Sequence, residues 1–376
     1  MKKIAVLGAH KNALPFYRQL RRFDDYQIVS IAWPEGAVCR ELCDTFYPVN
    51  FADREKVLEI CRKEKIDGIT SFALESALPT LTYIVQGMGL VGNGYECLEL
   101  TSTKYTQRQA LERAGIPVPL YWQVDTLDSV KPEQLPYPLI VKPVDSGGSQ
   151  GICKVDSPDE LPAAFNRAKS SSKSGRVIIE QYVDGREFSV EFISHHGRHY
   201  LLQITDKETS GAPLFVEMSH HQPADIPAET WDRIKNMVSS ALTALKIEDS
   251  PSHTEIKLNS KGELFIIETG ARMGGGHITS DLVRLSTGYD FVRGTVDLAV
   301  GDFKEPHFPE NHHSGVYFYS QLAPYVGDVI RRHEEYPEIV EWEIEDGPLA
   351  EVRSNAERYG YFLYQTNENK RFNPIK

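Results

Sequence analysis

An apolar strand and a glycine-rich loop follow one another in the stretch LIVKPVDSGGSQG, residues 139–151. The strand carries a single lysine, Lys142, and a charge in a buried strand is costly unless an opposite charge pairs with it. The glycines and hydroxyls of the loop would let backbone N–H groups surround an anion closely. Taken separately, the two parts suit an ion-paired lysine at a sheet edge and an ordinary hairpin turn. Taken together, they indicate a phosphate-binding site.

Two segments further along the chain fit a nucleotide site. The stretch VIIEQYVDGREFSVE, residues 177–191, predicts a strand, a short linker at Gly185, and a second strand with alternating apolar residues. A linker that leaves a strand exposes the backbone donors and acceptors that an adenine edge needs, and Glu187 is placed to accept hydrogen bonds from ribose hydroxyls. The next segment, EMSHHQPA at residues 217–224, contains a histidine pair, which in isolation more often packs in a core or faces solvent.

A hairpin with two glutamates completes the series. Its strands are SHTEIKL, residues 252–258, and the beginning of LFIIETGARMGGGH, residues 264–277. If the turn centres between Ser260 and Lys261, Glu255 lies opposite Ile266 and on the same face as Glu268, whereas a slip of one residue would separate the two carboxylates. Two carboxylates on one face, near a nucleotide, suit Mg²⁺. The alternative is a pair of surface glutamates on an ordinary hairpin.

The order of these segments resembles the ATP-grasp superfamily of carboxylate–amine ligases, over about residues 1–300. Within it, the chain is most similar to the L-amino-acid ligases, which join amino acids into dipeptides. The basis is His220-x-x-Pro223-Ala224, the spacing of Glu255 and Glu268, and the sequence ETGAR at residues 268–272 followed by its glycine run.

This resemblance implies an α/β protein with an α+β core. The expected ATP-grasp fold has an N-terminal Rossmann-like α/β domain over residues 1–100 and central ATP-grasp subdomains over residues 101–305. A lid subdomain is expected at about residues 138–190, and a small β-rich C-terminal subdomain at residues 306–376.

The resemblance also implies a role for each matched residue. ATP phosphates are expected to contact Lys104, Lys142, Ser146, Gly147, Gly148, Ser149 and Gly151. The adenosine is expected at Glu180, Tyr182, Val183 and Glu187, with Glu180 and Val183 acting through their main chain. The Mg²⁺ (or Mn²⁺) ligands would be Glu255 and Glu268. The substrates are expected at Glu217, His220, Arg272, Gly274 and Gly276, with Lys142, Arg272 and Gly275 taking part in catalysis. Many members have an asparagine where this chain has Gly270, so the metal would rely on two glutamates and phosphate oxygens.

The expected reaction activates a carboxylate, that of an amino acid, as an acyl-phosphate and joins it to an amine, releasing ADP and phosphate. Arg272 and the N–H groups of residues 274–276 would stabilise the oxyanion. No base for the attacking amine is evident. Two alternatives stay open: a purine-pathway or carbamoyl-phosphate-type ligase with a different acceptor, and a nucleotide-binding protein that has lost catalysis.

Composition limits the class of partner. The chain has 376 residues with 41 Lys and Arg against 53 Asp and Glu, for a net charge of −12. Such an acidic balance argues against binding to nucleic acid or to an anionic membrane, although it allows a local basic pocket for a small anion. We therefore expect small-molecule carboxylate and amine substrates, and a homodimer only by analogy with the family.

Other motifs are absent from the sequence. The segment GAHKNAL at residues 8–14 lacks the G-x-G-x-x-G spacing of a dinucleotide site. The five cysteines, Cys39, Cys43, Cys61, Cys97 and Cys153, match no zinc pattern and indicate free thiols in a reducing cytosol. The apolar run at the start of the chain is too short for a signal peptide, and no run is long enough to span a membrane. We therefore expect a cytoplasmic protein.

Hydrophobic patterning predicts the main elements. In residues 1–100, strands are expected at 3–7, 27–32, 45–49 and 66–72 and helices at 13–22 and 53–65, an alternation typical of a parallel sheet. A helix is expected from Lys104 to Gly115, an exposed serine-rich loop at 169–175, and a strand at 316–319. Aromatic residues are expected to build the C-terminal part of the core: Tyr317, Phe318, Tyr319, Tyr361, Phe362 and Tyr364. The acidic stretch 334–351 predicts a solvated face.

Overall fold

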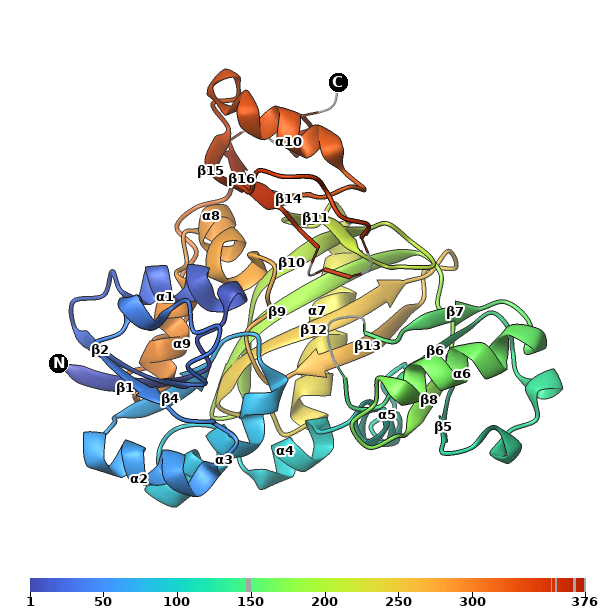
Figure 1. Cartoon of the computed structure of the whole chain (residues 1–376), viewed down its shortest axis with the longest axis horizontal. Helices are drawn as coiled ribbons and strands as arrows, with labels where there is room; N and C mark the ends of the chain where they lie inside the picture. The colour runs from blue at the N-terminus through green and yellow to red at the C-terminus, as the bar shows by residue number, and fades with distance from the viewer. Residues whose placement is uncertain (147–149, 353, 356, 368–369, 375–376) are drawn as a thin grey trace.

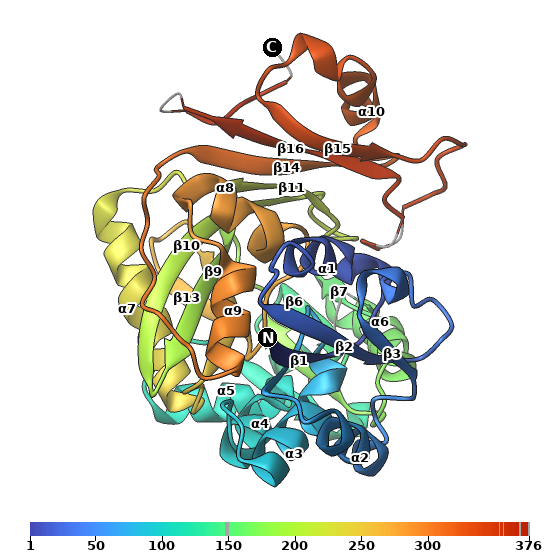
Figure 2. The same ribbon diagram turned by 90° about the vertical axis from the view of Figure 1, so that its left-hand side faces the viewer.

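Three β-sheets organise the described part of the chain, and each is flanked by helices (Figure 1). The structure is a computed structural model that describes residues 1–146, 150–352, 354–355, 357–367 and 370–374. The N-terminal domain, a small α/β unit and the C-terminal strands occupy three corners around a long central sheet. The same arrangement is visible from the side in Figure 2.

The strands have the following bounds. The first two sheets contain β1 (Lys2–Leu7), β2 (Tyr26–Ala32), β3 (Thr45–Pro48), β4 (Gly68–Ser71), β5 (Tyr121–Val124), β6 (Leu139–Pro143), β7 (Cys153–Val155) and β8 (Val177–Gln181). The long sheet contains β9 (Arg186–His195), β10 (Arg198–Thr209), β11 (Glu217–Gln222), β12 (Ser250–Leu258), β13 (Leu264–Gly270), β14 (His313–Tyr319), β15 (Ile339–Ile344) and β16 (Gly360–Thr366).

The α-helices lie between and outside these sheets. They are α1 (Leu14–Leu20), α2 (Arg54–Glu64), α3 (Leu78–Met88), α4 (Tyr95–Thr101), α5 (Lys104–Arg113), α6 (Leu161–Ser170), α7 (Ala228–Ala244), α8 (Val283–Thr287), α9 (Phe291–Ala299) and α10 (Pro324–Arg331). A π-helical turn, Ile278–Leu282, leads into α8.

The N-terminal sheet has the order β3-β2-β1-β4 with all neighbours parallel, as the alternation of patterns predicted. Ile4 and Val6 on β1 share a core with α1 and α9, whereas Ala5 and Leu7 pack toward α2 and α3. Strands that are buried on both faces read as continuous apolar runs, which is why β1 has no polar alternation. The predicted N-cap of α2 is confirmed, since the Asp53 carboxylate accepts from the N–H of Lys56.

The small α/β unit consists of the antiparallel sheet β5-β8-β6-β7 with α6 packed on it. Along the chain, the strands of this sheet run from β5, which starts at Tyr121, to β8, which ends at Gln181. The next strand, β9, belongs to the long sheet. The sheets therefore divide the chain slightly earlier than the lid range of about 138–190, whose boundaries stay a prediction. Helix α6 also takes in the first two residues of the segment that was expected to be an exposed loop, Lys169 and Ser170.

The long sheet has the order β13-β12-β9-β10-β11-β14-β16-β15 and is antiparallel throughout. The expected C-terminal β-rich part is present, but its strands β14, β16 and β15 extend this sheet instead of forming one of their own. Tyr317 and Phe362 stack with ring centroids 5.0 Å apart, and both pack in a cluster with α10.

The two faces of the central strands differ in chemistry. On β9, Phe188, Val190 and Phe192 are fully buried in a core shared with α7. Glu187 and Glu191 alternate with them and therefore project from the opposite face. The apolar face anchors the strand, so the charged face is held rigidly where neighbouring strands add their own polar residues.

The hairpin of β12 and β13 corrects one predicted register. Near the turn Ile256 pairs with Ile266 and not with Phe265, so the register is shifted by one residue from the expected one, and this slip alone would separate the two carboxylates. A bulge between Glu255 and Ile256 restores the alignment, and Glu255 pairs directly with Glu268. The predicted shared face is thus correct, but the predicted pairing of Glu255 with Ile266 is wrong.

Two of the general expectations can be compared with the structure. All five cysteines are unpaired thiols, as predicted. Among the described residues, no helix has both the length and the apolar character that a membrane crossing requires.

The two histidines on β11 have different environments. His221 is buried on the core side, where its Nδ1 lies 2.9 Å from the hydroxyl oxygen of Tyr364 and its Nε2 lies 2.9 Å from the hydroxyl oxygen of Ser219. Burial lowers the pKa of His221 to about 4. His221 is therefore a neutral core residue. This agrees, for one of the two histidines, with the interpretation that such a pair packs in a core.

This pKa predicts how stability depends on pH. Because an unfolded histidine titrates near pH 6.5 and folded His221 near pH 4, acid protonates the unfolded chain first. We expect this one residue to lower the free energy of unfolding by roughly 2 kcal/mol between pH 7 and pH 4.5. Urea unfolding at both pH values should therefore show a shallower pH dependence for His221→Gln than for the unmodified chain, and equal dependence would contradict the assignment.

Candidate active site

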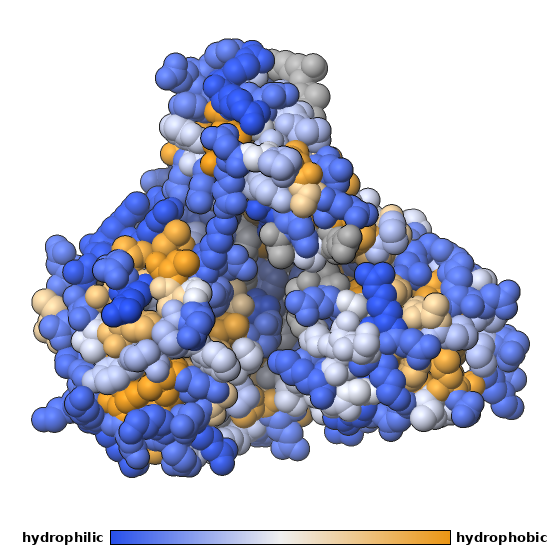
Figure 3. Space-filling model, viewed as in Figure 1, coloured by the Kyte–Doolittle hydropathy of each residue, from blue (hydrophilic) through white to orange (hydrophobic). Residues whose placement is uncertain are grey.

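A cleft of about 670 Å³ opens where the three corners of the molecule meet. Figure 3 shows the hollow at the centre of this face, between the N-terminal domain on the left, the small α/β unit on the right and the C-terminal strands above. Predicted site residues that line it are Lys104, Lys142, Ser146, Glu217, Glu255, Glu268, Arg272, Gly275 and Gly276. Residues from positions 104 to 276 therefore converge on one cavity.

Two lysines reach the cleft from different elements. Lys104 is the first residue of α5, fixed there by the N-cap Thr103, and its Nζ lies 2.8 Å from the carbonyl oxygen of Ser146 and 3.1 Å from Glu268 Oε1. Lys142 projects from β6, with its Nζ 2.6 Å from Glu180 Oε2. Both lysines are almost completely buried. Buried cations at one end of a cleft provide a site for an anionic ligand.

Glu180 has a second role that sequence reasoning missed. Its carboxylate is buried between Lys142 and Arg108, whose Nε donates to Glu180 Oε1 over 2.9 Å. Burial alone would raise the pKa of this carboxyl group, but Arg108 and Lys142 lower it below its ordinary value. Glu180 thus holds Lys142 through its side chain, which leaves the predicted main-chain contact with adenine open. Nothing in the pattern of α5 distinguished Arg108 from a surface arginine.

A buried lysine on β10, also missed, connects three of the predicted glutamates. The Nζ of Lys207 lies 2.7 Å from Glu255, 2.9 Å from Glu187 and 3.2 Å from Glu217. Burial alone would raise the pKa of Glu255, but Lys207 and His253 lower it below its ordinary value. Like Lys142, Lys207 is a single lysine within a buried strand, and this was the signal that could have found it.

Glu255 and Glu268 fit a Mg²⁺ ion. They face each other on adjacent strands, both line the cleft, and each already lies against a lysine that offsets its negative charge. Carboxylate oxygens near an anionic ligand are the donors that this small, hard cation prefers. The pairing therefore supports the predicted metal ligands, which stay a prediction.

Another group of three possible metal ligands, His195, His196 and Asp249, does not line the cleft. The Asp249 carboxylate accepts a hydrogen bond from the backbone N–H of His196 and lies 2.9 Å from His195 Nδ1. These contacts hold the turn between β9 and β10, which is sufficient to explain the group.

Arg272 faces the N-terminal domain. Its Nε donates a hydrogen bond to Glu75 Oε1 over 2.8 Å. Next to this contact, an isolated backbone β-bridge pairs Met273 with Phe72 of the N-terminal domain. Glu75 follows β4, lines the cleft and was not predicted, because nothing in its surroundings distinguishes it from other glutamates. An arginine and a glutamate side by side can bind the carboxylate and the ammonium group of an amino acid.

The glycine run after Arg272 is needed for close packing. A Cβ on Gly274 would lie 2.5 Å from His253 Nδ1, and one on Gly276 would lie 2.8 Å from His220 Cε1. Gly276 also has a left-handed φ of +59°. Gly275 has only an ordinary contact and opens on the cleft, whereas Gly274 is covered by His253 and is not among the lining residues. Substrate contact by Gly274 therefore stays a prediction with less support than contact by Gly275.

The C-terminal strands complete one wall. Arg358 stacks on Phe318, with its guanidinium carbon 3.6 Å from the ring centroid, and its Nη2 lies 2.8 Å from Glu217 Oε2. His220 lies next to them, with Nδ1 3.0 Å from the carbonyl oxygen of Gly276 and Nε2 3.6 Å from Glu217. Glu217 and His220 are thus brought together as predicted, and Arg358 is an addition.

The acidic stretch agrees with its prediction in part. It was predicted to form a solvated face, yet part of it is strand β15, and Glu343 and Glu345 line the cleft. Glu345 forms an ion pair with Lys11 of the N-terminal domain. The rest of the stretch agrees with the predicted solvated face, since Glu334, Glu335 and Asp346 are exposed and do not line the cleft.

The four residues predicted for the nucleoside are not among those that line the cleft, although Glu180 contacts the lining residue Lys142. The Tyr182 ring lies between Lys154 and Lys257, whose Nζ atoms are 5.2 Å and 5.4 Å from its centroid. Glu187 contacts Lys207 and Lys257, and Val183 is buried.

The predicted phosphate loop is described in part. Ser146 donates its hydroxyl to the carbonyl of Ser171, and Gly151 has a left-handed φ of +70°. Gly147, Gly148 and Ser149 lie outside the described residues.

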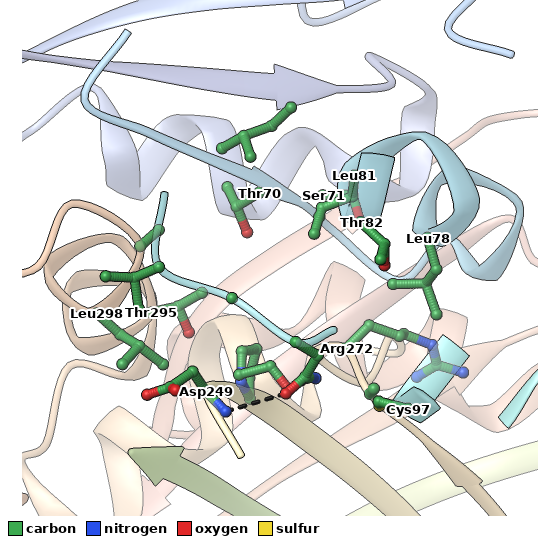
Figure 4. Close-up of a pocket in the computed structure, with 18 of the residues that line it drawn as sticks. Thr70, Ser71, Leu78, Leu81, Thr82, Cys97, Asp249, Arg272, Thr295 and Leu298 are labelled. Atoms are coloured by element: carbon green, nitrogen blue, oxygen red, sulfur yellow. Dashed lines mark hydrogen bonds between the residues drawn. The ribbon is translucent and has the colours of Figure 1, made fainter. Parts of the chain in front are cut away.

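A second, smaller cavity of about 50 Å³ lies on the other side of Arg272 (Figure 4). It lies between the N-terminal domain and the central sheet. Apolar groups such as Leu78 and Leu298 line it, together with the hydroxyls of Ser71 and Thr295. Neither hydroxyl has a hydrogen-bond partner among the described residues. The space suits a few water molecules and is far too small for a nucleotide.

Comparisons with known proteins agree with this geometry. Residues 135–281 match the model of the ATP-grasp domain family. An L-amino acid ligase from Bacillus licheniformis has the same fold, with a TM-score of 0.83 and 23% identity over 98% of this chain and 94% of that chain.

Two curated relatives are similar in sequence. An L-arginine-specific L-amino acid ligase of Bacillus subtilis is 25% identical over 76% of this chain and 69% of its own length. An uncharacterised protein of Sinorhizobium fredii is 29% identical over 63% of this chain, which spans about half (49%) of that relative.

The contacts of Lys207 predict a large loss of stability when its charge is removed. Lys207→Met leaves three carboxylates without their shared cation, which should cost roughly 3–5 kcal/mol in unfolding free energy. Lys257→Met is the matched control, because this lysine lies on the next strand but one, and among the described carboxylates it forms an ion pair with Glu187 alone, at 3.9 Å. Chemical unfolding of both variants measures the difference, and similar small losses would contradict a central role for Lys207.

Proposed function

We propose that this chain, a member of the ATP-grasp superfamily, is an ATP- and Mg²⁺-dependent ligase that activates an amino-acid carboxylate as an acyl-phosphate and joins it to an amine. The products are ADP, phosphate and an amide. The observation that supports this most strongly is the cleft itself. Buried Lys104 and Lys142 lie at one end with the Glu255–Glu268 pair, and Arg272 with Glu75 lies beside them.

The phosphate end follows from the charges. Lys104 and Lys142 line the cleft and are oriented by Glu268 and Glu180, so ATP phosphates can pair with two cations that are already in place. Glu255 and Glu268 would hold Mg²⁺, which when bound neutralises phosphate oxygens and polarises the phosphorus for attack. The side chain of Glu180, anchored by Arg108, keeps Lys142 in place during this exchange.

Arg272 marks the part of the cleft where the substrate carboxylate would react. A carboxylate is a poor electrophile and must be activated before an amine can attack it. It would be activated by attacking the γ-phosphorus of ATP, which forms a mixed anhydride that an amine can attack. Arg272 offsets the charge that develops on the transferred phosphoryl group, and the N–H of Gly275, next to it and open to the cleft, is available to the oxyanion. Cleft walls from all three corners of the molecule limit the access of water to the acyl-phosphate.

An amino acid suits this end of the cleft best. Glu75 beside Arg272 provides an anion for an α-ammonium group next to a cation for the activated carboxylate. Glu217, His220 and Arg358 form a second polar group, on β11 and the C-terminal segment, that is suited to the acceptor. The identity of neither amino acid follows from these contacts, so the experiment must screen for both.

The test is a screen of amino acids, singly and in pairs, with ATP and Mg²⁺, in which released phosphate and the nucleotide product are measured. We expect phosphate release that requires both the metal and an amino acid, with ADP as the nucleotide. AMP as the product would contradict the acyl-phosphate route, and no turnover with any carboxylate–amine pair would contradict a ligase.

Glu268→Gln distinguishes an enzyme from a protein that only binds nucleotide. The substitution removes one predicted metal ligand, so turnover should fall by roughly 100-fold or more while ATP still binds. Glu263→Gln, an exposed residue at the turn of the same hairpin, is the matched control and should retain turnover. Unchanged turnover in Glu268→Gln would contradict the assigned metal site.

A further inference from the structure

His277 occupies an unusual place in the cleft. It directly follows the glycine run, lines the cavity and precedes the π-helical turn Ile278–Leu282. Its φ is +63°, in the left-handed region that a residue with a side chain rarely adopts. Such backbone conformations persist where the surrounding structure enforces them, and they are concentrated at functional sites.

The imidazole of His277 is oriented by a buried carboxylate. Its Nδ1 lies 2.8 Å from Oδ2 of Asp281, which also accepts from the hydroxyl of Ser280. The other oxygen of Asp281 accepts from Nε2 of Gln19 on α1, over 3.0 Å. Because the carboxylate is an acceptor, it selects the tautomer with a proton on Nδ1, which leaves the lone pair on Nε2.

The position of the ring is fixed on its other side by an aromatic residue. The Tyr361 ring centroid lies 4.1 Å from that of His277, and the Tyr361 hydroxyl donates to Glu341 on β15. None of the described residues forms a hydrogen bond to Nε2 of His277. This nitrogen is therefore an acceptor without a partner in the described chain, on a residue that lines the cleft.

Other charged groups near His277 come from each surrounding element. Asp281 is in contact with it, and Arg284 acts on Asp281 from the start of α8. Lys11 and Arg18 approach from the N-terminal domain, and Glu343 and Glu345 from the C-terminal strands line the same cleft, with Lys11 and Glu345 paired. Asp281 alone of these charged groups has a described direct contact with the imidazole.

The other two histidines of the site are less suited to accept a proton. His253 has Nδ1 2.6 Å from Glu191 and Nε2 3.7 Å from Glu255, so both nitrogens face carboxylates. His220 has Nδ1 against the carbonyl oxygen of Gly276, and its Nε2 is buried 3.6 Å from Glu217. The Nε2 of His220 also has no hydrogen-bond partner, but His220 is fully buried and is not among the residues that line the cleft, whereas His277 is.

We propose that His277 is the general base of the ligation step and that Asp281 is its positioning residue. This inference rests on the proposed function. The amine nitrogen attacks the carbonyl carbon of the acyl-phosphate and a C–N bond forms. Before this attack, an acceptor that enters as an ammonium ion gives one proton to Nε2 of His277, which frees the lone pair of the nitrogen. The second proton passes from the nitrogen to the departing phosphate as the C–O bond breaks with its electron pair leaving on phosphate. The proton on His277 then returns to solvent or to the departing phosphate.

The location agrees with this chemistry. His277 is two residues from Gly275 and five from Arg272, the groups assigned to the oxyanion and the phosphoryl group. A base on the same short loop approaches the same carbonyl carbon from the cleft side, where an acceptor amine must enter. Most amino groups carry an extra proton at neutral pH, so a base is needed to remove this proton before the nitrogen can attack.

The test separates the two half-reactions. Hydroxylamine, a nucleophile that is largely unprotonated at neutral pH, traps an acyl-phosphate as a hydroxamate without needing a base. We expect His277→Gln and His277→Ala to form hydroxamate at close to the original rate, while amide formation with an amino-acid acceptor falls roughly 100-fold or more. The loss should be in kcat more than in KM and should diminish as the pH rises toward the pKa of the acceptor amine.

Matched variants distinguish a base from a structural residue. Asp281→Asn should lower amide formation less than His277→Ala does and shift its pH profile, whereas His312→Ala, at a histidine that does not line the cleft, should leave both reactions unchanged. Full amide formation in both His277 variants would overturn this inference alone, as would equal loss of hydroxamate and amide. The absence of hydroxamate with the unmodified chain and any amino acid would overturn the proposed ligase and, with it, the role of His277.

Discussion

Glu255 and Glu268 face each other on neighbouring strands, an arrangement that is repulsive unless cations lie close to both carboxylates. The structure supplies Lys207 to the first and Lys104 to the second. Each of these lysines has a further contact, Lys207 with Glu187 and Glu217 and Lys104 with the backbone of Ser146. The cleft is thus a network of buried ion pairs, and removing one member leaves others without compensation.

This network explains how an acidic chain can bind an acidic ligand. The net charge of −12 describes the whole molecule, whereas the phosphate end of the cleft carries buried lysines held by carboxylates. When a nucleotide and Mg²⁺ bind, the lysines can pair with the phosphates and the glutamates can pair with the metal. The charges that the ligands bring into the cleft are then offset by charges that the site already holds.

Sequence reasoning found the residues that stand out by local pattern: the lone Lys142 in an apolar strand, the two hairpin glutamates, and Arg272 before a glycine run. It placed the parallel sheet of the N-terminal domain correctly, because strand and helix patterns alternate along residues 1–100. It missed Glu75, Arg108 and Arg358, whose importance comes only from partners far away in the chain. The bulge beside Glu255 was also invisible, because a bulge changes pairing without any single required residue type.

The central claim is that the carboxylate oxygen attacks the γ-phosphorus of ATP, and oxygen transfer tests it most directly. The amino acid found in the screen is labelled with ¹⁸O in its carboxylate, allowed to react with the acceptor, ATP and Mg²⁺, and the released phosphate is examined by mass spectrometry or ³¹P NMR. The account predicts that one labelled oxygen appears in each phosphate released. Product formation with unlabelled phosphate would contradict it, because the carboxylate would not have been phosphorylated.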